Sequence, residues 1–306
     1  MSANNEARGN NRAIGFSFEF FPPKKPEAEA SWWRSVQALS AYSPEFVSVT
    51  YGAGATSQAP TYAAVKRLVD ETDLVTASHL TVVKATSGEV DDVIRRFRDA
   101  GIRRFVALRG DPPGGIGTAY SPHPGGYSNA AALVSALKTI GDFDISVSAY
   151  PEKHPESADR TGDIAMLKAK ADNGADRALT QFFFDNDVFE DYLNDVRRAG
   201  ITIPVVPGIM PIQNIKQLKN FAARCGANVP AFVDSRFEGL DDDLPGQFEA
   251  AADLAAEQVL DLQRRGLSEF HFYTMNRSKL QIAVLDRLGI MPDDTQIGAA
   301  PERLRA

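Results

Sequence analysis

Residues 14–51 read IGFSFEFFPPKKPEAEASWWRSVQALSAYSPEFVSVTY, and this stretch contains the repeating unit of the fold. Residues 14–20 and 46–51 are short apolar runs rich in Phe and Val, which is typical of buried strands. Residues 27–41 between them have the longer, mixed pattern of an amphipathic helix. A strand, a helix and a second strand in this order predict a parallel β-α-β unit.

The same alternation continues along the chain. Nearly continuous apolar strands are typical of a sheet that is covered on both faces. Further strand-like runs are residues 75–80, 104–108, 145–150, 177–184, 203–207 and 270–273, and further helix-like segments are 61–71, 88–100, 129–141, 157–174, 188–200, 212–226, 245–266 and 280–288. We therefore predict an α/β fold, a single (β/α)8 TIM barrel over residues 13–291, which suits a chain of 306 residues. A doubly wound sheet is the alternative.

The ends and the composition limit the class of protein. Residues 1–12 are polar and Asn-rich and are predicted to be a disordered tail, and residues 292–306 are predicted to be a loose end. The apolar runs are too short to cross a membrane, and a formal charge of −7 argues against nucleic acid as a partner. The single cysteine, Cys225, excludes an internal disulfide and fits a reducing, cytoplasmic location.

Polar residues stand where nearly every predicted strand ends. In a barrel, chemistry is located at the carboxyl ends of the strands. Many converging polar groups at that end predict a site for a large ligand. In chain order these residues are Glu19, Thr50, Tyr51, His79, Arg109, Gly110, Asp111, Tyr150, His154, Gln181, Gly208, Thr274 and Arg277.

Glu19 and Asp111 are the candidate catalytic residues. Glu19 is flanked by Phe residues and prolines, so poor solvation should raise the pKa of its carboxyl and suit it to general acid catalysis. An ion pair with Arg109 or Arg277 is the alternative. Asp111 precedes two prolines and is either a turn residue or a carboxylate that binds an amino-bearing heterocycle.

Several other chemistries lack their motifs. His79 and His154 have no paired metal-ligand spacing, so no metal site is predicted. The acidic run at 241–243 is interpreted as a loop and helix N-terminus, where carboxylates suit the helix dipole. No Gly-x-Gly-x-x-Gly motif follows a strand, so a separate nicotinamide-binding domain is not expected.

The strand-end segments resemble methylenetetrahydrofolate reductase of the bacterial type. The matching segments follow the order of that family and extend over nearly the whole chain, from Gly15 to Gly289. They are 18–23 (FEFFPP), 46–53 (FVSVTYGA), 79–81 (HLT), 107–111 (ALRGD), 143–147 (FDISV), 149–152 (AYPE), 154–156 (HPE), 180–185 (TQFFFD), 207–209 (PGI), 270–274 (FHFYT) and 276–277 (NR).

The resemblance implies an activity and a set of site residues. FAD would lie across the carboxyl ends of the strands, NAD(P)H, with NADH favoured, would reduce it, and methylenetetrahydrofolate would then be reduced to methyltetrahydrofolate for one-carbon metabolism and methionine synthesis. Glu19 would protonate N10 of the folate, and Asp111 would contact the pterin. Flavin contacts are implied for Thr50, Tyr51, Ala53, His79, Arg109, Gly110, Asp111, Tyr127, Tyr150, His154, Asp163 and Lys170. Substrate contacts are implied for Asp111, Gln181, Gln217, Phe221 and Arg277. The resemblance also implies a homo-oligomer.

Two features depart from the family pattern. Met166 and Ala169 stand where some members carry an Asn and an Arg that reach the FAD diphosphate, and the Gly-rich loop 112–127 is longer than usual. A flavin-independent NADH–folate oxidoreductase and a non-catalytic folate-binding barrel are therefore the alternatives. The presence of Glu19 argues against the second. A lysine-based aldolase is disfavoured because Lys84 and Lys153 lie in polar loops.

Overall fold

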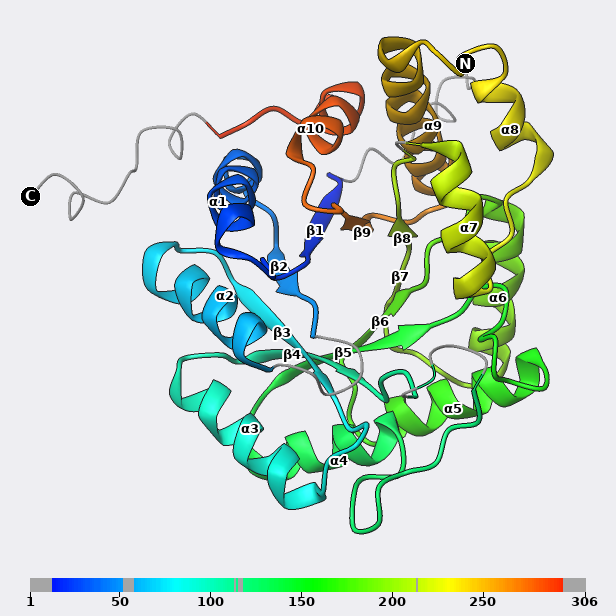
Figure 1. Ribbon diagram of the computed structural model, residues 1–306. Coiled ribbons are helices and arrows are strands. Elements are labelled where there is room, and N and C mark those ends of the chain that lie inside the picture. The colour runs from blue at the N-terminus through cyan, green and yellow to red at the C-terminus, as the bar shows by residue number, and fades with distance from the viewer. Residues whose placement is uncertain (1–12, 52–57, 113, 115–117, 213, 294–306) are drawn as a thin grey trace, which may run out of the picture.

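The strands form one parallel sheet that curves round into a barrel (Figure 1). The computed structural model describes residues 13–51, 58–112, 114, 118–212 and 214–293. The strand order is β7-β6-β5-β4-β3-β2-β1-β9-β8. The strands are β1 (Gly15–Phe20), β2 (Phe46–Val49), β3 (Thr76–Thr81), β4 (Arg104–Leu108), β5 (Asp144–Ala149), β6 (Arg177–Thr180), β7 (Val205–Val206), β8 (Gly208–Ile209) and β9 (Glu269–Tyr273).

The seventh barrel strand closes the sheet although it is split in two. β7 pairs with β6, and β8 pairs with β9, so the two halves join opposite edges of the sheet. Between them lies Pro207, which has no N–H to donate to a ladder. Its carbonyl accepts from His271 N at 2.9 Å, and Gly208 N turns aside to donate to Thr180 Oγ1 at 2.8 Å. The prediction of a single (β/α)8 barrel is confirmed, and the doubly wound alternative is wrong.

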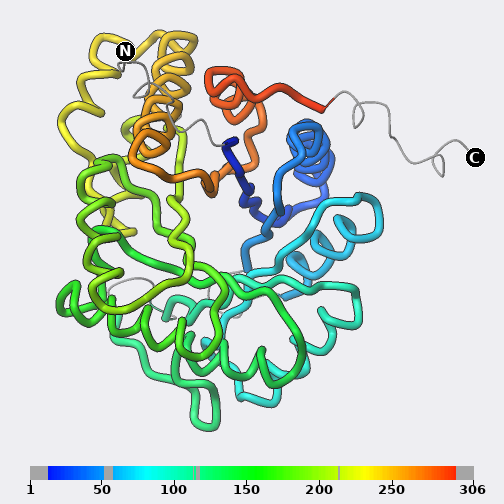
Figure 2. The backbone as a smooth tube through the Cα atoms, turned by 180° about the vertical axis from the view of Figure 1, so that it is seen from behind, coloured from blue at the N-terminus to red at the C-terminus, as the bar shows by residue number. Residues whose placement is uncertain are grey.

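Helices surround the barrel on its outside (Figure 2). They are α1 (Pro26–Ser40), α2 (Gln58–Glu71), α3 (Ser87–Asp99), α4 (Ala130–Ile140), α5 (Arg160–Asp172), α6 (Asn186–Arg198), α7 (Ile215–Cys225), α8 (Ala231–Phe237), α9 (Leu244–Arg264) and α10 (Ser278–Arg287). The short helix α8 was not predicted, because seven residues give too little apolar periodicity to recognise. Near the end of the described chain, Asp293 N donates to Ala41 O at 2.6 Å. Both predicted tails, residues 1–12 and all but the start of 292–306, lie outside the described residues.

Short polar side chains fix where several helices begin. Thr86 and Glu89 form a reciprocal capping box at the start of α3. Asn129, Asp159 and Asn214 cap α4, α5 and α7 by accepting a backbone N–H of the first turn. The prediction for the acidic run 241–243 is confirmed, because Asp243 caps α9 by accepting from Gly246 N.

The strands separate two layers of side chains. Phe16, Phe18 and Phe20 of β1 pack in the large core between the sheet and the helices. Because side chains alternate along a strand, the residues between them, Ser17 and Glu19, face the barrel interior. That interior contains only a small apolar cluster of its own: Phe46, Ala77, Val106, Leu179 and Val206, with Leu108 packed against it. The rest of the interior is therefore available to polar side chains.

Candidate active site

The candidate acid, Glu19, lies between two histidine side chains near the carboxyl ends of β1, β3 and β9. Its Oε2 is 3.3 Å from His79 Nε2 and 3.5 Å from His271 Nε2. The histidine side chains are 7% and 0% exposed, whereas 14% of the Glu19 side chain remains exposed. The carboxylate is thus reachable from the barrel mouth while two imidazoles face it from inside.

The predicted rise in the pKa of Glu19 is wrong. Burial does raise the pKa of this carboxyl, but the charge and hydrogen bonding of His79 and His271 together outweigh burial and lower the pKa from 4.5 to about 2. The prediction failed because it relied on sequence neighbours. Phe18 and Phe20 point to the outer core, and the environment of Glu19 is set by other strands.

His271 is a candidate site residue that sequence reasoning missed. Its Nδ1 lies 2.7 Å from Ser17 Oγ, and its Nε2 is buried without a well-aligned hydrogen-bond partner among the described residues. The 3.5 Å approach to Glu19 is therefore a close polar contact rather than a regular hydrogen bond. The signal was available in the sequence, since Phe270 and Phe272 flank His271 and strand alternation turns it inward.

The segment after β9 holds the backbone around Glu19. Thr274 donates to the Glu19 carbonyl through its N at 3.2 Å and its Oγ1 at 2.6 Å. Asn276 binds both backbone polar groups of Phe21. Its side chain accepts from Phe21 N at 2.9 Å and donates to Phe21 O at 3.0 Å. Asn276 has a positive φ of 58°, which asparagine tolerates better than most residues. These contacts fix the end of β1.

A second cluster lies at the ends of β4 and β5. Arg109 forms a bidentate ion pair with Glu156, at 2.7 and 2.9 Å, and its Nε donates to Gly110 O at 3.2 Å. These contacts use three of the five guanidinium N–H groups. Since Arg109 pairs with Glu156, and no arginine of the described chain pairs with Glu19, the arginine alternative for Glu19 is wrong.

Two aromatic side chains stand next to this ion pair. His154 Nδ1 accepts from Glu156 N at 3.1 Å, which leaves the ring proton on Nε2. Burial and the charge of Arg109 lower the pKa of His154. Its ring meets the Tyr150 ring edge-on, with centroids 4.7 Å apart. Burial raises the pKa of Tyr150 to about 12, so both groups are neutral hydrogen-bonding partners at neutral pH.

Helix α5 contributes one acidic residue, Asp163, and one basic residue, Lys170, to this cluster. Asp163 accepts from His154 N at 2.8 Å and from the Ser157 hydroxyl. Lys170 is buried, with 5% of the residue exposed, and its Nζ donates to Ser148 O at 2.6 Å. Burial lowers the pKa of Lys170 to about 8. No carboxylate of the described residues lies within 4 Å of this ammonium, so it is a buried cation without an ion-pair partner.

Gly110 and Asp111 follow β4 at the rim. Gly110 has a φ of +86°, and a Cβ there would lie 2.8 Å from Val83 Cγ1 and 2.9 Å from Thr81 Cβ, so only glycine fits. Asp111 is half-buried. Its charge raises the pKa of Tyr150, which shows that the carboxylate is near the second cluster.

A third group lies across the mouth on β6 and α7. The rings of Phe182 and Phe221 stack with centroids 5.5 Å apart and an interplanar angle of 14°. Gln181 is half-buried, and its Oε1 accepts from Phe182 N at 3.1 Å. Tyr273 of β9 donates from its hydroxyl to Thr180 O at 2.6 Å, which joins this group to the strand beside Glu19.

Comparison with known proteins matches this chain to one family. The model of the family described as methylenetetrahydrofolate reductase matches residues 4–289. The chain belongs to the methylenetetrahydrofolate reductase family. It is 43% identical to the 5,10-methylenetetrahydrofolate reductase of Escherichia coli K12 over 91% of this chain and 92% of that protein. A rice protein described as a probable methylenetetrahydrofolate reductase (NADH) is 33% identical over 97% of this chain and 52% of its own length.

The fold comparison agrees with the barrel. A Clostridium thermocellum protein that binds two copies of 5-methyl-5,6,7,8-tetrahydrofolic acid has a TM-score of 0.60 and 15% identity, covering 91% of this chain and 97% of that one. At this identity the likeness concerns the fold alone. Together, the family match and the E. coli relative identify the chain as an oxidoreductase of the methylenetetrahydrofolate reductase family.

Not all residues expected from the family lie together. Tyr127 donates to Asp91 Oδ1 of α3 at 2.6 Å, on the outer flank of the barrel. Gln217, in the first turn of α7, and Arg277, before α10, are both exposed. Ala53 lies outside the described residues. Thr50 and Tyr51 are half-buried at the end of β2, where Thr50 N donates to Phe20 O at 2.9 Å.

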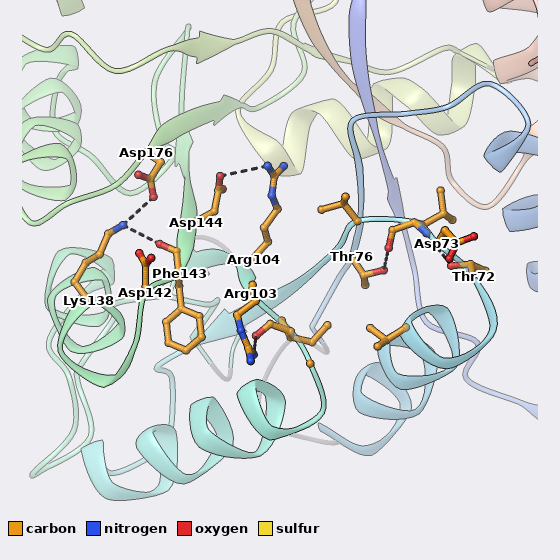
Figure 3. A pocket seen from close by; sticks show the side chains of 15 residues that line it. Thr72, Asp73, Thr76, Arg103, Arg104, Lys138, Asp142, Phe143, Asp144 and Asp176 are labelled. Carbon is orange, nitrogen blue, oxygen red and sulfur yellow. Dashed lines mark hydrogen bonds and ion pairs between the residues drawn. The ribbon is translucent and has the colours of Figure 1, made fainter.

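The opposite end of the barrel has a cleft of about 520 Å³ at the amino ends of β3, β4 and β5 (Figure 3). Two of its cations are in ion pairs: Arg104 lies 3.4 Å from Asp144, and Lys138 lies 3.0 Å from Asp176. Within the described ranges, no three His, Cys, Asp or Glu side chains gather as metal ligands, and no helix could cross a membrane.

Proposed function

We propose that this family member reduces 5,10-methylenetetrahydrofolate to 5-methyltetrahydrofolate with FAD as cofactor and NADH as reductant. The observation that carries the proposal is the carboxylate of Glu19, largely buried but still 14% exposed, in contact with His79 and His271. A carboxylate with proton-holding groups behind it suits the delivery of one proton to a ring nitrogen. The names of the E. coli and rice relatives support the substrate and the reductant.

The residues present fit a cofactor that carries a diphosphate. Lys170 is a buried ammonium without a carboxylate partner, and Arg109 keeps N–H donors beyond those that Glu156 uses. A bound anion would offset the cost of burying the Lys170 charge. Met166 and Ala169 offer no hydrogen bond to such a group, so the two cations would hold it by themselves.

Glu19 and the residues around it would supply the proton for the reduction of the folate. A bound flavin, once reduced by the pyridine nucleotide, supplies the hydride. Glu19 delivers a proton to N10 of the folate, which opens the five-membered ring and leaves a cationic iminium on N5. The imidazoles of His79 and His271, 3.3 and 3.5 Å from the Glu19 carboxylate, are the side chains placed to pass a proton to it. Ser17 holds the His271 ring with its second nitrogen facing Glu19.

Asp111, Gln181 and Phe221 would position the substrates. The Asp111 carboxylate at the rim favours a cationic iminium and accepts hydrogen bonds from the amino group of a pterin. Gln181 has an amide nitrogen for which no hydrogen bond is found in the described part of the chain, and it could bind either substrate. The Phe221 ring offers a flat apolar surface for a nicotinamide or a pterin.

Visible absorption and half-reactions test this proposal. We expect the purified protein to show flavin absorption, to be bleached by NADH without oxygen, and to regain colour with methylenetetrahydrofolate. Glu19→Gln should leave the NADH step nearly unchanged and slow the folate step by roughly 10²-fold or more. The control Glu71→Gln, on the exposed face of α2, should leave both steps unchanged.

Two results would contradict parts of the proposal. Equal loss of both half-reactions in Glu19→Gln would make Glu19 a structural residue. A colourless protein that oxidises NADH only when folate is present would support the flavin-independent alternative. The 38% exposure of Met166 and the presence of Ala169 at the expected diphosphate side give that alternative its specific basis.

A further inference from the structure

The aromatic ring of Phe46 lies in the barrel interior, near the amino ends of the strands. This residue is 3% exposed and belongs to the small interior cluster with Ala77, Val106, Leu179 and Val206. That cluster is separate from the large core between sheet and helices. Phe46 is therefore not needed to attach a helix to the sheet, and its environment is the interior that also contains the acid.

Phe46 lies in the same row as the imidazole behind Glu19. In the strand register, Ser17 pairs with Phe46 on one side and with His271 on the other. The rings of Phe46 and His271 are nearly parallel, at 18°, with centroids 6.0 Å apart. Ser17 Oγ holds the near nitrogen of His271 at 2.7 Å. The imidazole is thus contacted by the Ser17 hydroxyl and the Phe46 ring, and the Tyr273 ring meets it edge-on with centroids 5.4 Å apart.

The His271 ring needs such a second contact to keep its orientation. Its only regular hydrogen bond among the described residues is to Ser17, because the 3.5 Å contact with Glu19 is poorly aligned. Because the Ser17 hydroxyl can itself rotate, this hydrogen bond still permits small tilts of the ring about the Cβ–Cγ bond. A flat neighbour removes this freedom, since a tilted imidazole would collide with it.

Phe46 is itself held from the closed end of the barrel. The guanidinium carbons of Arg104 and Arg177 lie over its ring, 5.1 and 5.8 Å from the centroid. Both arginines are first residues of their strands and share the carboxylate of Asp144. Figure 3 shows Arg104 and Asp144 joined at this end. The cation–π contacts and the shared ion pair fix the ring.

We propose that Phe46 is a positioning residue for the acid: held by Arg104 and Arg177, its ring keeps the His271 imidazole oriented toward Glu19. The proposal rests on the proposed function of Glu19. It assigns a role in the chemistry to the charged cluster at the amino ends of the strands, away from the candidate active site. The role is exerted through His271 and not by contact with the reacting atoms.

Nuclear magnetic resonance of the histidine rings tests the positioning directly. The chain has four histidines, so selective ¹⁵N labelling gives few signals. In the protein as purified, Glu19→Gln should shift the His271 ring resonances. In Phe46→Leu, the same second substitution should shift them much less, because the ring no longer faces position 19. Phe105→Leu is the control, since Phe105 is equally buried but packs on Phe97 and Phe143 in the outer layer.

Half-reactions give the functional readout. We expect Phe46→Leu to slow the folate step by roughly tenfold while flavin reduction by NADH changes by less than about twofold. Phe105→Leu should affect the two steps equally. If Phe46→Leu does not fold, Phe46→Met keeps the volume without the flat ring.

Two outcomes would overturn the proposal: an undiminished response of His271 to Glu19→Gln in the Phe46 variant, or equal loss of both half-reactions. If the unaltered protein does not reduce folate at all, the proposed function fails. The resonance experiment needs no substrate and still decides the role of Phe46.

Discussion

Lys170→Met should stabilise the protein without its cofactor and weaken its hold on FAD. Lys170 is buried on α5, and burial lowers the pKa of its ammonium from 10.5 to about 8. A buried cation without a carboxylate partner costs folding free energy. Methionine has nearly the same length and no charge, so it fills the same space without that cost.

The magnitude follows from the pKa. A fall from 10.5 to about 8 corresponds to about 3 kcal/mol of unfolding free energy at pH 7, at 1.36 kcal/mol for each pKa unit. The variant loses the hydrogen bond from Nζ to Ser148 O, worth about 1 kcal/mol. We therefore expect a net gain of about 2 kcal/mol at pH 7. Loss of a charged hydrogen bond to the diphosphate should weaken FAD binding roughly ten- to hundredfold.

The gain should depend on pH with a defined sign. Above pH 8 the folded protein releases the Lys170 proton while the unfolded chain still binds it, so raising the pH stabilises the unaltered protein. The advantage of Lys170→Met should therefore shrink as the pH rises from 8 toward 10.5. The exposed Lys168, paired with Asp172 on the same helix, is the matched control, and Lys168→Met should change stability by less than about 0.5 kcal/mol at any pH.

Urea unfolding of flavin-free protein, followed by tryptophan fluorescence at pH 7 and pH 9.5, measures these differences, and flavin fluorescence measures FAD affinity. A Lys170→Met variant that is less stable at pH 7, by the same amount at both pH values, would refute the reasoning. Unchanged FAD affinity would separately remove Lys170 from the cofactor site.

Three further substitutions, one of them with a matched control, test other parts of the structure. Asp111→Asn should retain flavin and slow the folate half-reaction at least tenfold, by roughly the electrostatic contribution of one carboxylate, in anaerobic stopped-flow measurements; a colourless protein would mark Asp111 as a turn residue. Gly110→Ala should destabilise by roughly 2 kcal/mol in urea unfolding, because φ is +86° and Val83 stands 2.8 Å from the new Cβ. Gly125→Ala, with positive φ but open space, should cost less, and equal costs would contradict the steric argument. Asp243→Ala should cost about 1 kcal/mol by removing the cap of α9, with activity unchanged; a loss of activity would contradict a purely structural role.

The architecture was predictable because it rests on local patterns. Each barrel strand is an apolar run, and each long helix has a periodic apolar face, so eight strands and their order could be predicted without tertiary information. The seventh strand was predicted at 203–207, which contains β7 but stops before β8. The strand divides at Pro207 because β7 pairs with β6 whereas β8 pairs with β9. Which strand each half pairs with is not visible in the sequence.

The site was predictable only as far as strand ends define it. Glu19, His79, Arg109 and Tyr150 could be predicted as candidates because they stand at carboxyl ends of strands. His271 was missed because it lies between two phenylalanines, inside a strand that looks fully apolar. Its importance follows from the register that sets it beside Ser17, and register is a long-range property.

The pKa of Glu19 shows why that register matters for mechanism. A carboxyl group with a pKa of about 2 is protonated in only about one molecule in 10⁵ at pH 7. The protonated fraction of Glu19 is thus smaller than the 10²- to 10⁴-fold gain in rate that general acid catalysis typically contributes could offset. With so low a pKa, the proposed acid role requires a proton to be brought to Glu19 when the folate binds. His79 and His271 are the imidazoles in contact with its carboxylate, so under the proposed function the three side chains act together.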